Sequence, residues 1–240
     1  RHVAAHRRPK TAKLFSLRYH TIICRGPKIC AGPAERGVYM ILCCRIPSLM
    51  EQKLYERLRM LSAPGRLEKA DRLPSGKRAA SLAAGLLLEA SLRCETGKQG
   101  LSLLVREAEH GKPVLPPELG LWLSLSHSGD FALCAVTRRP VGADIQKIVP
   151  VRERLLHKVC SIAEREWILK AASAAERERR FCRIWALKES WLKATGVGLA
   201  GLADVRFTPL PEGLTGPEGW RFRAFSLPEG YEGAICEAEG

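Results

Sequence analysis

Long apolar runs are absent from this sequence of 240 residues, and that absence argues against a membrane protein. No uninterrupted apolar run reaches about 18 residues, so no membrane-spanning helix is predicted. The longest candidate, residues 79–90, is interrupted by Ser81, Gly85 and Glu89 and is typical of a buried helix. No clean apolar stretch with a small-residue cleavage site follows the basic start of the chain, which argues against a signal peptide.

Patterned cysteines and the commonest hydrolase motif are also lacking. The nine cysteines include no C-x-x-C pair, and the six histidines do not lie beside them at metal-ligand spacing. Such an odd, unpatterned set indicates reduced, mostly buried thiols, so we expect a cytoplasmic protein, and it argues against a zinc or disulfide framework. The sequence has no G-x-S-x-G nucleophile motif either.

Acidic residues are scarce relative to basic ones. With 39 Lys and Arg against 25 Asp and Glu, the formal net charge is +14, which favours a polyanionic partner: nucleic acid, a phosphorylated small molecule or an acidic protein. Residues 1–37 hold nine of the basic residues and a single acid. We expect residues 1–39 to be an irregular extension. Whether it is disordered, mistranslated upstream sequence or a basic arm that binds RNA or a membrane surface is left open.

From residue 40 onward the hydrophobic pattern predicts a mixture of strands and helices, typical of the α+β class. The expected halves are 40–140 and 141–240. Helices are predicted at 49–61, 75–93 with Ser75 as N-cap, 151–171 and 175–195. Strands are predicted at 40–46, from 101, on both sides of the turn at 126–130, within 140–148, and at 203–210, 218–226 and 231–238.

The segment "WALKESWLKATG", residues 185–196, combines an acid with two lysines on one predicted helix. Trp185, Glu189 and Lys193 are spaced by four and share one helical face. Glu before Lys at this spacing is also the favourable order for an ordinary surface ion pair. The helix is therefore either a plain amphipathic helix, ended by Gly196, or part of a site.

A second segment, "VGADIQ" at 141–146, places Asp144 in an apolar strand with Gln146 on the same face. A carboxylate is costly to bury there unless it is paired or bound to a cation. The side-chain oxygens of Asp144 and Gln146, together with the Glu189 carboxylate, would make a site of the kind that Mg²⁺ prefers. A salt-bridged or capping aspartate is the alternative.

Two polar turns offer groups suited to a phosphate. In "SLSHSGD", residues 124–130, Ser126 and His127 are adjacent, which does not suit the geometry of a Ser-His-Asp triad; the alternative is a plain hairpin turn. In "HGKP", Lys112 lies within a Gly/Pro turn and is weak evidence alone. Weak evidence, taken one residue at a time, also comes from the earlier basic residues Arg66, Lys69, Lys77 and Arg78.

Taken together, four motifs resemble the 4′-phosphopantetheinyl transferase superfamily in its larger, pseudo-dimeric form. They are "GKP" at 111–113, "SHS" at 126–128, "GADIQ" at 142–146 and the helix at 185–196, in the family's order. The resemblance covers about 40–240. It implies two similar α+β halves related by a pseudo-two-fold, with coenzyme A in the cleft between them, and a monomer.

The resemblance also implies a reaction and roles for individual residues. The enzyme would transfer 4′-phosphopantetheine from coenzyme A to a serine of an acyl or peptidyl carrier protein, releasing 3′,5′-ADP. Asp144 and Glu189 would hold Mg²⁺, Glu189 would act as general base, and Lys193 would bind the transferred phosphate. His127 and Ser126, the latter through its hydroxyl or backbone, would hold the 3′-phosphate end of the nucleotide.

Further basic residues would line the coenzyme A site: Lys112 near the nucleotide, and Arg66, Lys69 and Arg78 at the entrance. The sequence departs from the family at Gln146, where a second acid is usual, and we expect weaker metal binding for that reason. Two alternatives remain. One is a basic nucleic-acid-binding protein, although no aromatic-basic RNA motif is present. The other is a relative that binds coenzyme A with little catalysis. The sequence does not indicate which carrier is served.

Overall fold

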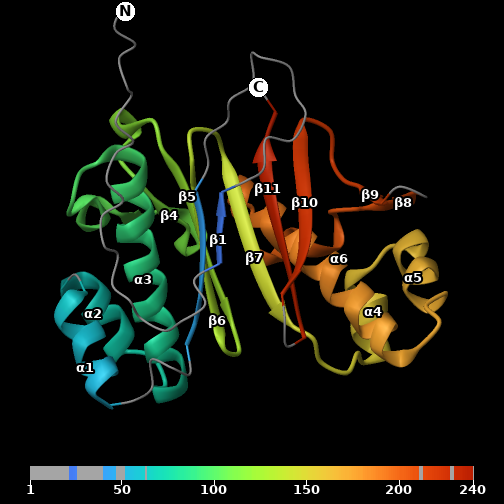
Figure 1. The fold of residues 1–240 in the computed structure, drawn as a ribbon. Helices are drawn as coiled ribbons and strands as arrows, with labels where there is room; N and C mark the ends of the chain where they lie inside the picture. The colour runs from blue at the N-terminus through green and yellow to red at the C-terminus, as the bar shows by residue number, and fades with distance from the viewer. Residues whose placement is uncertain are drawn as a thin grey trace, which may run out of the picture.

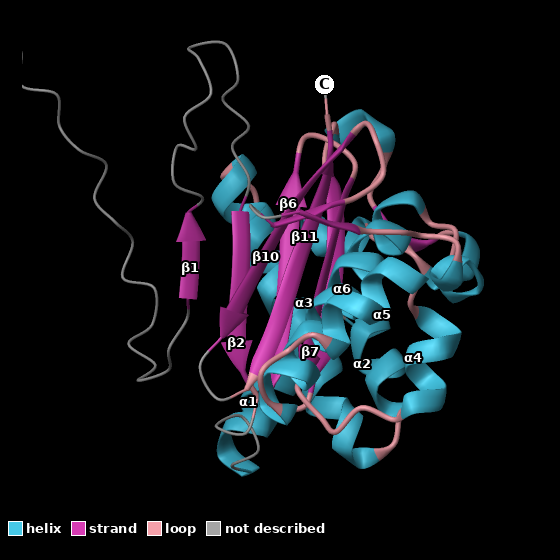
Figure 2. Cartoon of the chain, turned by 90° about the vertical axis from the view of Figure 1, so that its right-hand side faces the viewer, coloured by secondary structure: helices cyan, strands magenta, loops and turns pink. Residues whose placement is uncertain are grey.

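Two antiparallel sheets, with helices gathered on one side of them, form the architecture (Figures 1 and 2). The computed structural model describes residues 22–25, 40–46, 52–62, 64–210, 213–227 and 230–239. The first sheet has the order β1 (Ile22–Arg25), β2 (Met40–Arg45), β6 (Phe131–Thr137), β5 (Trp122–Ser128). The second has the order β10 (Trp220–Leu227), β11 (Tyr231–Ala238), β7 (Val141–Lys147). The α+β class predicted from the sequence is confirmed.

The two sheets repeat one succession of elements. In the first, β2 leads into α3 (Ser75–Thr96) and then into the hairpin β5–β6, whose second strand pairs with β2. In the second, β7 leads into α6 (Ala174–Thr195) and then into the hairpin β10–β11, whose second strand pairs with β7. Each long helix packs on its own sheet, so the strands β5 and β7 lie between the two helices.

The first core lies between α3 and its sheet. It includes Leu82, Leu88 and Leu92 of the helix against Cys134 and Val136 of β6. Two shorter helices, α1 (Gln52–Leu61) and α2 (Pro64–Asp71), pack against α3 from outside. This layer fixes the position of β5, the edge strand that faces the second sheet.

The second core lies between α6 and its sheet, and Gly142 sets how close the helix comes. A Cβ at this position would lie 1.7 Å from the backbone oxygen of Ser190, so only glycine fits. The close approach brings α6 directly over the same face of β7 that bears Asp144, two residues farther along. Two short helices, α4 (Glu153–Val159) and α5 (Ile162–Leu169), complete this half.

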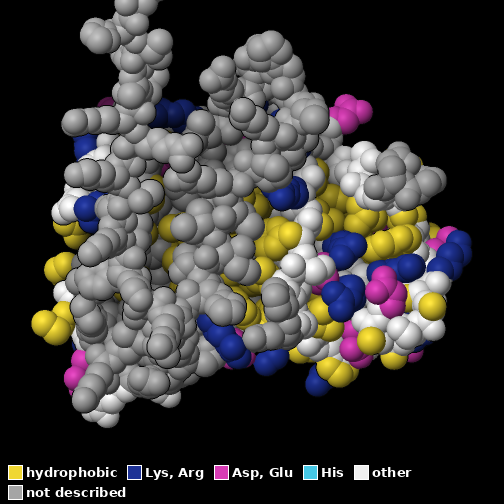
Figure 3. All heavy atoms as spheres, in the orientation of Figure 1, with side chains coloured by type: hydrophobic (Ala, Val, Ile, Leu, Met, Phe, Trp, Pro, Cys, Tyr) yellow, Lys and Arg dark blue, Asp and Glu magenta, His cyan; other side chains and the backbone are white. Residues whose placement is uncertain are grey.

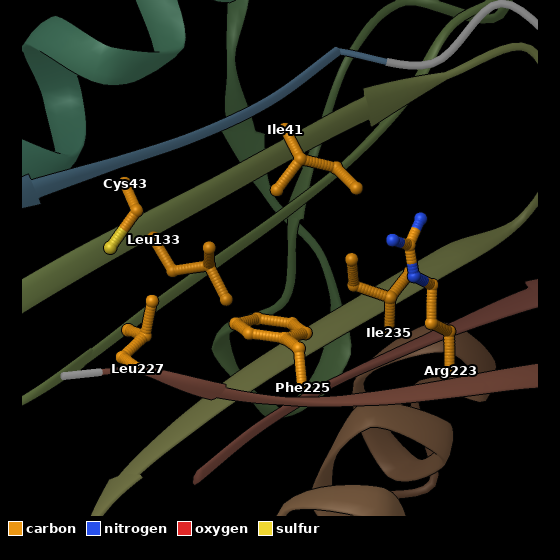
Figure 4. A pocket seen from close by; sticks show the side chains of 7 residues that line it. All are labelled: Ile41, Cys43, Leu133, Arg223, Phe225, Leu227 and Ile235. Carbon is orange, nitrogen blue, oxygen red and sulfur yellow. The ribbon is translucent and has the colours of Figure 1, made fainter. Parts of the chain in front are cut away.

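The faces of the sheets that point away from the helices are apolar and form a third cluster with members from both sheets. Figure 3 looks onto this side, where hydrophobic side chains gather near the centre. A pocket there, shown in Figure 4, is lined by Ile41, Cys43, Leu133, Arg223, Phe225, Leu227 and Ile235. The residues of the candidate site lie instead on the helix side of β7.

Several predicted elements are confirmed and others are wrong. The strands at 40–46, within 140–148 and at 231–238 are confirmed, as is the helix from Ser75. The two strands around the predicted turn at 126–130 are also confirmed, but the turn is shorter than expected, because β5 continues to Ser128 and β6 begins at Phe131. Ser75 is not its N-cap, however, because Pro74 occupies the cap position. The strand expected from 101 is a 3₁₀ helix, Leu101–Leu104. The carboxylate of Glu89 accepts hydrogen bonds from the backbone N–H groups at the start of that turn and so favours it over a strand.

The long helix expected at 151–171 is two helices, α4 and α5. Ser161 begins α5 through a capping box with Glu164, and Cys160 between the helices is extended. The segment 203–210 is also mostly not a strand. It contains the end of a 3₁₀ helix, Leu199–Ala203, and then β8 (Thr208–Leu210), which pairs with β9 (Gly213–Thr215).

The prediction of an irregular extension needs a correction at one point. Residues 22–25 form β1 and pair with β2. The rest of 1–39 lies outside the described residues. A short ribbon of β3 (Arg106–Glu107) and β4 (Pro113–Val114) holds the turn around Lys112, with 3₁₀ helices at Glu109–Gly111 and Pro117–Leu119. Within the described part of the chain, no helix has the length and apolar character needed to cross a membrane.

Candidate active site

The two sheets meet where β5 and β7 lie side by side (Figure 1), and serine hydroxyls connect these strands. Alternate residues of β5 accept hydrogen bonds from alternate backbone N–H groups of β7. The pairs are Ser124 with Ala143 at 2.9 Å, Ser126 with Ile145 at 3.3 Å and Ser128 with Lys147 at 3.0 Å. We call these three contacts the serine seam. It fixes the register of one sheet against the other.

Asp144 lies beside the seam, on the face of β7 toward α6, and is only 1% exposed. Its Oδ1 accepts hydrogen bonds from the Ser126 hydroxyl at 2.7 Å and from Lys193 Nζ at 2.5 Å. Its Oδ2 accepts from the Gln146 amide at 2.8 Å. The prediction that Asp144 and Gln146 share a face is confirmed, and the buried carboxylate is paired, as its desolvation requires.

Glu189 lies one turn before Lys193 on α6 and is half-buried. Burial raises the pKa of its carboxyl group, the negative charge of Asp144 raises it further, and Lys193 opposes both. Among the described residues, no hydrogen bond to this carboxylate is found. The structure therefore brings together Asp144, Gln146, Glu189 and Lys193, and it leaves Glu189 as the acid with free oxygens.

The donor set of this cluster fits a hard divalent cation. Two carboxylates and a carboxamide oxygen are the ligands that Mg²⁺ prefers. Burial is the main cause of the raised pKa of Glu189, and repulsion from Asp144 adds to it; a cation shared by the two carboxylates would relieve that repulsion. Over the described ranges, no group of three or more His, Cys, Asp and Glu side chains is placed to hold a metal, so Gln146 is the candidate for a third protein oxygen.

His127, next to Ser126 in the chain, is exposed on β5 and lies close to two lysines. Partial desolvation lowers the pKa of its imidazole, and the positive charges of Lys193 and Lys77 lower it further. Lys77 lies in the first turn of α3, where acids rather than bases are usually favoured. This concentration of positive charge is suited to an anion. From the sequence, Lys77 was named only as one of several weak basic candidates and received no role, although a basic first turn was a usable signal.

Lys112 is held at the end of α6. Its ammonium donates to the backbone oxygen of Ala194 at 2.5 Å and lies 5.7 Å from the centre of the Trp122 ring. Burial lowers the pKa of this lysine. Gly196 ends the helix with a φ of 83°, as predicted. Lys112 thus stabilises the terminus of the helix that bears Glu189 and Lys193.

The three basic residues expected at the coenzyme A entrance make other contacts. Arg66 packs against Gly85 of α3, and burial lowers the pKa of its guanidinium. Lys69 pairs with Glu107, and Arg78 donates to the backbone oxygens of Leu73 and Asp71. Within the described part of the chain, none of these bonds reaches the acidic cluster. Their role at an entrance stays a prediction.

The hydroxyl of Ser126 does not fit the phosphate contact that the resemblance implies. It donates to Asp144, and it accepts from Ile145 and from Lys193 at 3.0 Å. A hydroxyl has one hydrogen to donate and two lone pairs, so these three bonds use its full capacity. The side chain is also buried.

A buried ion pair that the sequence argument missed lies on the other side of α6. Lys188 Nζ is 2.8 Å from Glu164, and both side chains are fully buried. Lys188 also donates to the backbone oxygen of Val159 at 2.7 Å, while Glu164 accepts from the backbone of Ser161 and Phe207. This pair fixes α5 against α6 and so holds the rotation of α6 that turns Glu189 toward Asp144.

The fold and the cluster define an α+β protein whose helix α6 supplies one acid and one lysine to a second acid on β7. The model of the 4′-phosphopantetheinyl transferase superfamily matches residues 140–235, the stretch that contains this arrangement. A 4′-phosphopantetheinyl transferase of Bacillus subtilis is 30% identical over 146 residues, 58% of this chain and 64% of that protein. Over this stretch the chain is similar to members of the superfamily, and the resemblance predicted from its motifs is confirmed.

Other relatives match over shorter lengths. A 4′-phosphopantetheinyl transferase of Nostoc is 35% identical over 42% of this chain and 45% of that protein, and one of Escherichia coli K12 is 38% identical over 37% and 46%. The chain thus spans about half to two thirds of these relatives. The solved holo-[acyl-carrier-protein] synthase of Thermotoga maritima matches 42% of this chain and 62% of its own with a TM-score of 0.34 and 22% sequence identity.

Proposed function

We propose that the protein transfers 4′-phosphopantetheine from coenzyme A to a serine of an acyl or peptidyl carrier protein, with release of 3′,5′-ADP. The main support is the pair of the buried Asp144 carboxylate with Lys193, beside Glu189, whose carboxylate accepts no hydrogen bond among the described residues, within the segment that matches the superfamily. The relatives' names support the same reaction. Catalysis on this proposal is mostly positioning and neutralisation of charge.

The acidic cluster would hold the metal. Asp144 and Glu189, with Gln146 as a further oxygen donor, would bind Mg²⁺, which when bound supplies positive charge to the pyrophosphate of coenzyme A. Lys193 is partly exposed beside Asp144 and would bind an oxygen of the phosphoryl group being transferred. Lys77 would add positive charge, and the His127 ring would offer an N–H donor, for the nucleotide phosphates.

Glu189 would act as general base, directly or through water. Its raised pKa and free oxygens suit it to accept the proton of the attacking serine hydroxyl. The serine oxygen forms a bond to the β-phosphorus of coenzyme A, and the bond from that phosphorus to the bridging pyrophosphate oxygen breaks. The leaving group is 3′,5′-ADP, which retains the bridging oxygen.

Coenzyme A would bind on the helix side of the serine seam, between the two halves, with Arg66, Lys69 and Arg78 toward the entrance. This proposal is supported by the pKa of His127, which is lowered by the charges of both Lys77 from α3 and Lys193 from α6, so the two long helices place positive charge near one point. The repeated succession of elements supports a pseudo-two-fold relation, in which one chain supplies both halves and acts as a monomer.

Mass spectrometry tests the proposal. Apo-carrier proteins are incubated with this protein, coenzyme A and Mg²⁺, and we expect one carrier to gain a single phosphopantetheine. Addition of a chelator should prevent the gain, and the Lys193→Ala variant should slow it. The proposal is wrong if apo-carriers from fatty-acid, polyketide and nonribosomal-peptide systems all stay unmodified while a known transferase modifies them.

A weakly catalytic relative that binds coenzyme A is the second candidate, favoured by Gln146 in place of an acid. Calorimetric binding of coenzyme A without carrier modification would select it. The nucleic-acid alternative predicts instead that binding depends on the basic extension. Because residues 22–25 form β1, the deletion that tests it should remove only residues 1–21. On our proposal, this deletion leaves transfer intact.

A further inference from the structure

The serine seam replaces backbone pairing where the two sheets meet. The first sheet ends at β5 and the second at β7, and the hydroxyls of β5 accept hydrogen bonds from the backbone of β7. Each hydroxyl therefore accepts the hydrogen bond that a backbone carbonyl oxygen would accept between two paired strands. A side chain in this role determines how far β7 lies from β5 and at which register.

Ser126 differs from the other members of the seam in what else it contacts. Ser124, also buried, returns its hydrogen bond toward the backbone oxygen of Ala143 at 3.4 Å, so it links only the two strands. Ser126 instead donates to the Asp144 carboxylate and accepts from the Lys193 ammonium. One oxygen atom thus joins β5, the backbone of β7, the acid of the candidate site and the lysine of α6.

We propose that Ser126 is a positioning residue that fixes Asp144 and Lys193 relative to the backbone of β7, and this inference rests on the proposed transfer reaction. Without the hydroxyl, Asp144 keeps Lys193 on Oδ1 and Gln146 on Oδ2, both through flexible side chains, and loses its hydrogen bond to β5. The pair would then lie displaced from where the metal and the phosphoryl group need it. Displacements of about 1 Å in such groups slow reactions by about 10²-fold.

This role predicts an effect on turnover rather than on coenzyme A binding, because the Ser126 hydroxyl has no hydrogen-bonding capacity left for a substrate phosphate. Ser126→Ala should lower kcat by about 10- to 100-fold and leave KM for coenzyme A within about twofold of the wild type. Ser124→Ala is the matched control, because it removes a buried seam hydroxyl that touches neither Asp144 nor Lys193. It should leave both constants nearly unchanged. Ser126→Thr, which retains a hydroxyl, should recover most of the turnover.

A second measurement needs no activity. Urea unfolding of Ser126→Ala, Asp144→Asn and the double variant forms a thermodynamic cycle, and a parallel cycle uses Ser124→Ala. We expect strong coupling between Ser126 and Asp144 and additive effects for Ser124 and Asp144. Equal coupling in both cycles would overturn the inference even if transfer were never detected.

The kinetic outcomes separate this inference from the proposed function. If the wild type shows no transfer to any carrier, the function is wrong, and the unfolding cycles still test the contact. If the wild type is active, two results would contradict the positioning role. One is equal kcat values for Ser126→Ala and Ser124→Ala. The other is a raised KM for coenzyme A with unchanged kcat, which would indicate a direct substrate contact.

Discussion

The two lysines of α6, five positions apart, form ion pairs of opposite character. Lys188 pairs with Glu164, and neither side chain has any exposed surface. Lys193 pairs with Asp144, but about 30% of its side-chain surface remains exposed. The first pair is enclosed between helices, whereas the second lies where a solute can reach the lysine.

The acids around these lysines differ in the same way. Glu164 is saturated by Lys188 and by the backbone N–H groups of Ser161 and Phe207. Glu189, the residue next to Lys188, has no hydrogen bond among the described residues, and its pKa is raised by burial and by Asp144. A saturated buried pair holds helices together, while an acid with free oxygens beside a second acid can bind a cation or take up a proton.

The largest effect should follow removal of either acid of the site. Asp144→Ala or Glu189→Ala should lower transfer by about 10³-fold or more, because each removes an oxygen donor for the metal and Glu189 also removes the proposed base. Circular dichroism should show a retained fold. Near wild-type turnover by either variant, measured by mass spectrometry of the carrier, would contradict the assignment.

The two lysines provide a paired test. Lys188→Ala should lower the unfolding free energy by about 3–5 kcal/mol, because it leaves the buried Glu164 without its partner charge. Lys193→Ala should cost less stability, because Ser126 and Gln146 still donate to Asp144, but it should slow transfer by about 10²-fold. Urea titrations and single-turnover assays measure both quantities. Equal losses of stability, or unchanged transfer by Lys193→Ala, would remove the distinction between the pairs.

The raised pKa of Glu189 predicts a pH-dependent gain in stability on its removal. The folded protein binds the proton of the Glu189 carboxyl more tightly than the unfolded chain does. The stability that this proton contributes is therefore fully present below the ordinary pKa of 4.5, and it is lost as the pH rises through the higher pKa of the folded state. Glu189→Gln should therefore become more stable relative to the wild type as pH increases from about 4 to 7. Thermal melts across this range measure the effect, with the exposed Glu153→Gln as control. A constant difference would refute it.

The smallest expected effect concerns Gln146. Gln146→Glu should lower the Mg²⁺ concentration required for half-maximal transfer by up to about tenfold, because a carboxylate adds charge where the carboxamide adds only a dipole. Stability should fall slightly at the same time, because the amide that donates to Asp144 is lost. An unaltered metal titration would place Gln146 away from the ion.

Local patterns in the sequence predicted the elements that hold the site. The strand spacing put Asp144 and Gln146 on one face, and the helical spacing aligned Glu189 with Lys193. Contacts between distant segments were not accessible in this way. The partner of Lys188 comes from another helix, and the three bonds of Ser126 come from two segments, so no local period reveals them.

Predictions also failed where a neighbouring residue altered the local conformation. Pro74 took the cap position expected of Ser75. The carboxylate of Glu89 favoured a 3₁₀ turn where the apolar run at 101–104 suggested a strand. The start of a new helix at Ser161 divided a periodic stretch into two helices. The glycine of the "GADIQ" segment acquired a physical reason only from the packing of Ser190 against it.

Binding of Mn²⁺, followed by electron paramagnetic resonance in the presence of coenzyme A, tests most directly whether Asp144 and Glu189 share one cation. We expect the wild type to bind one ion, and we expect Asp144→Ala and Glu189→Ala each to abolish that binding while Glu153→Ala leaves it unchanged. If either site variant binds Mn²⁺ as tightly as the wild type, the two acids do not hold a common ion and the account is wrong.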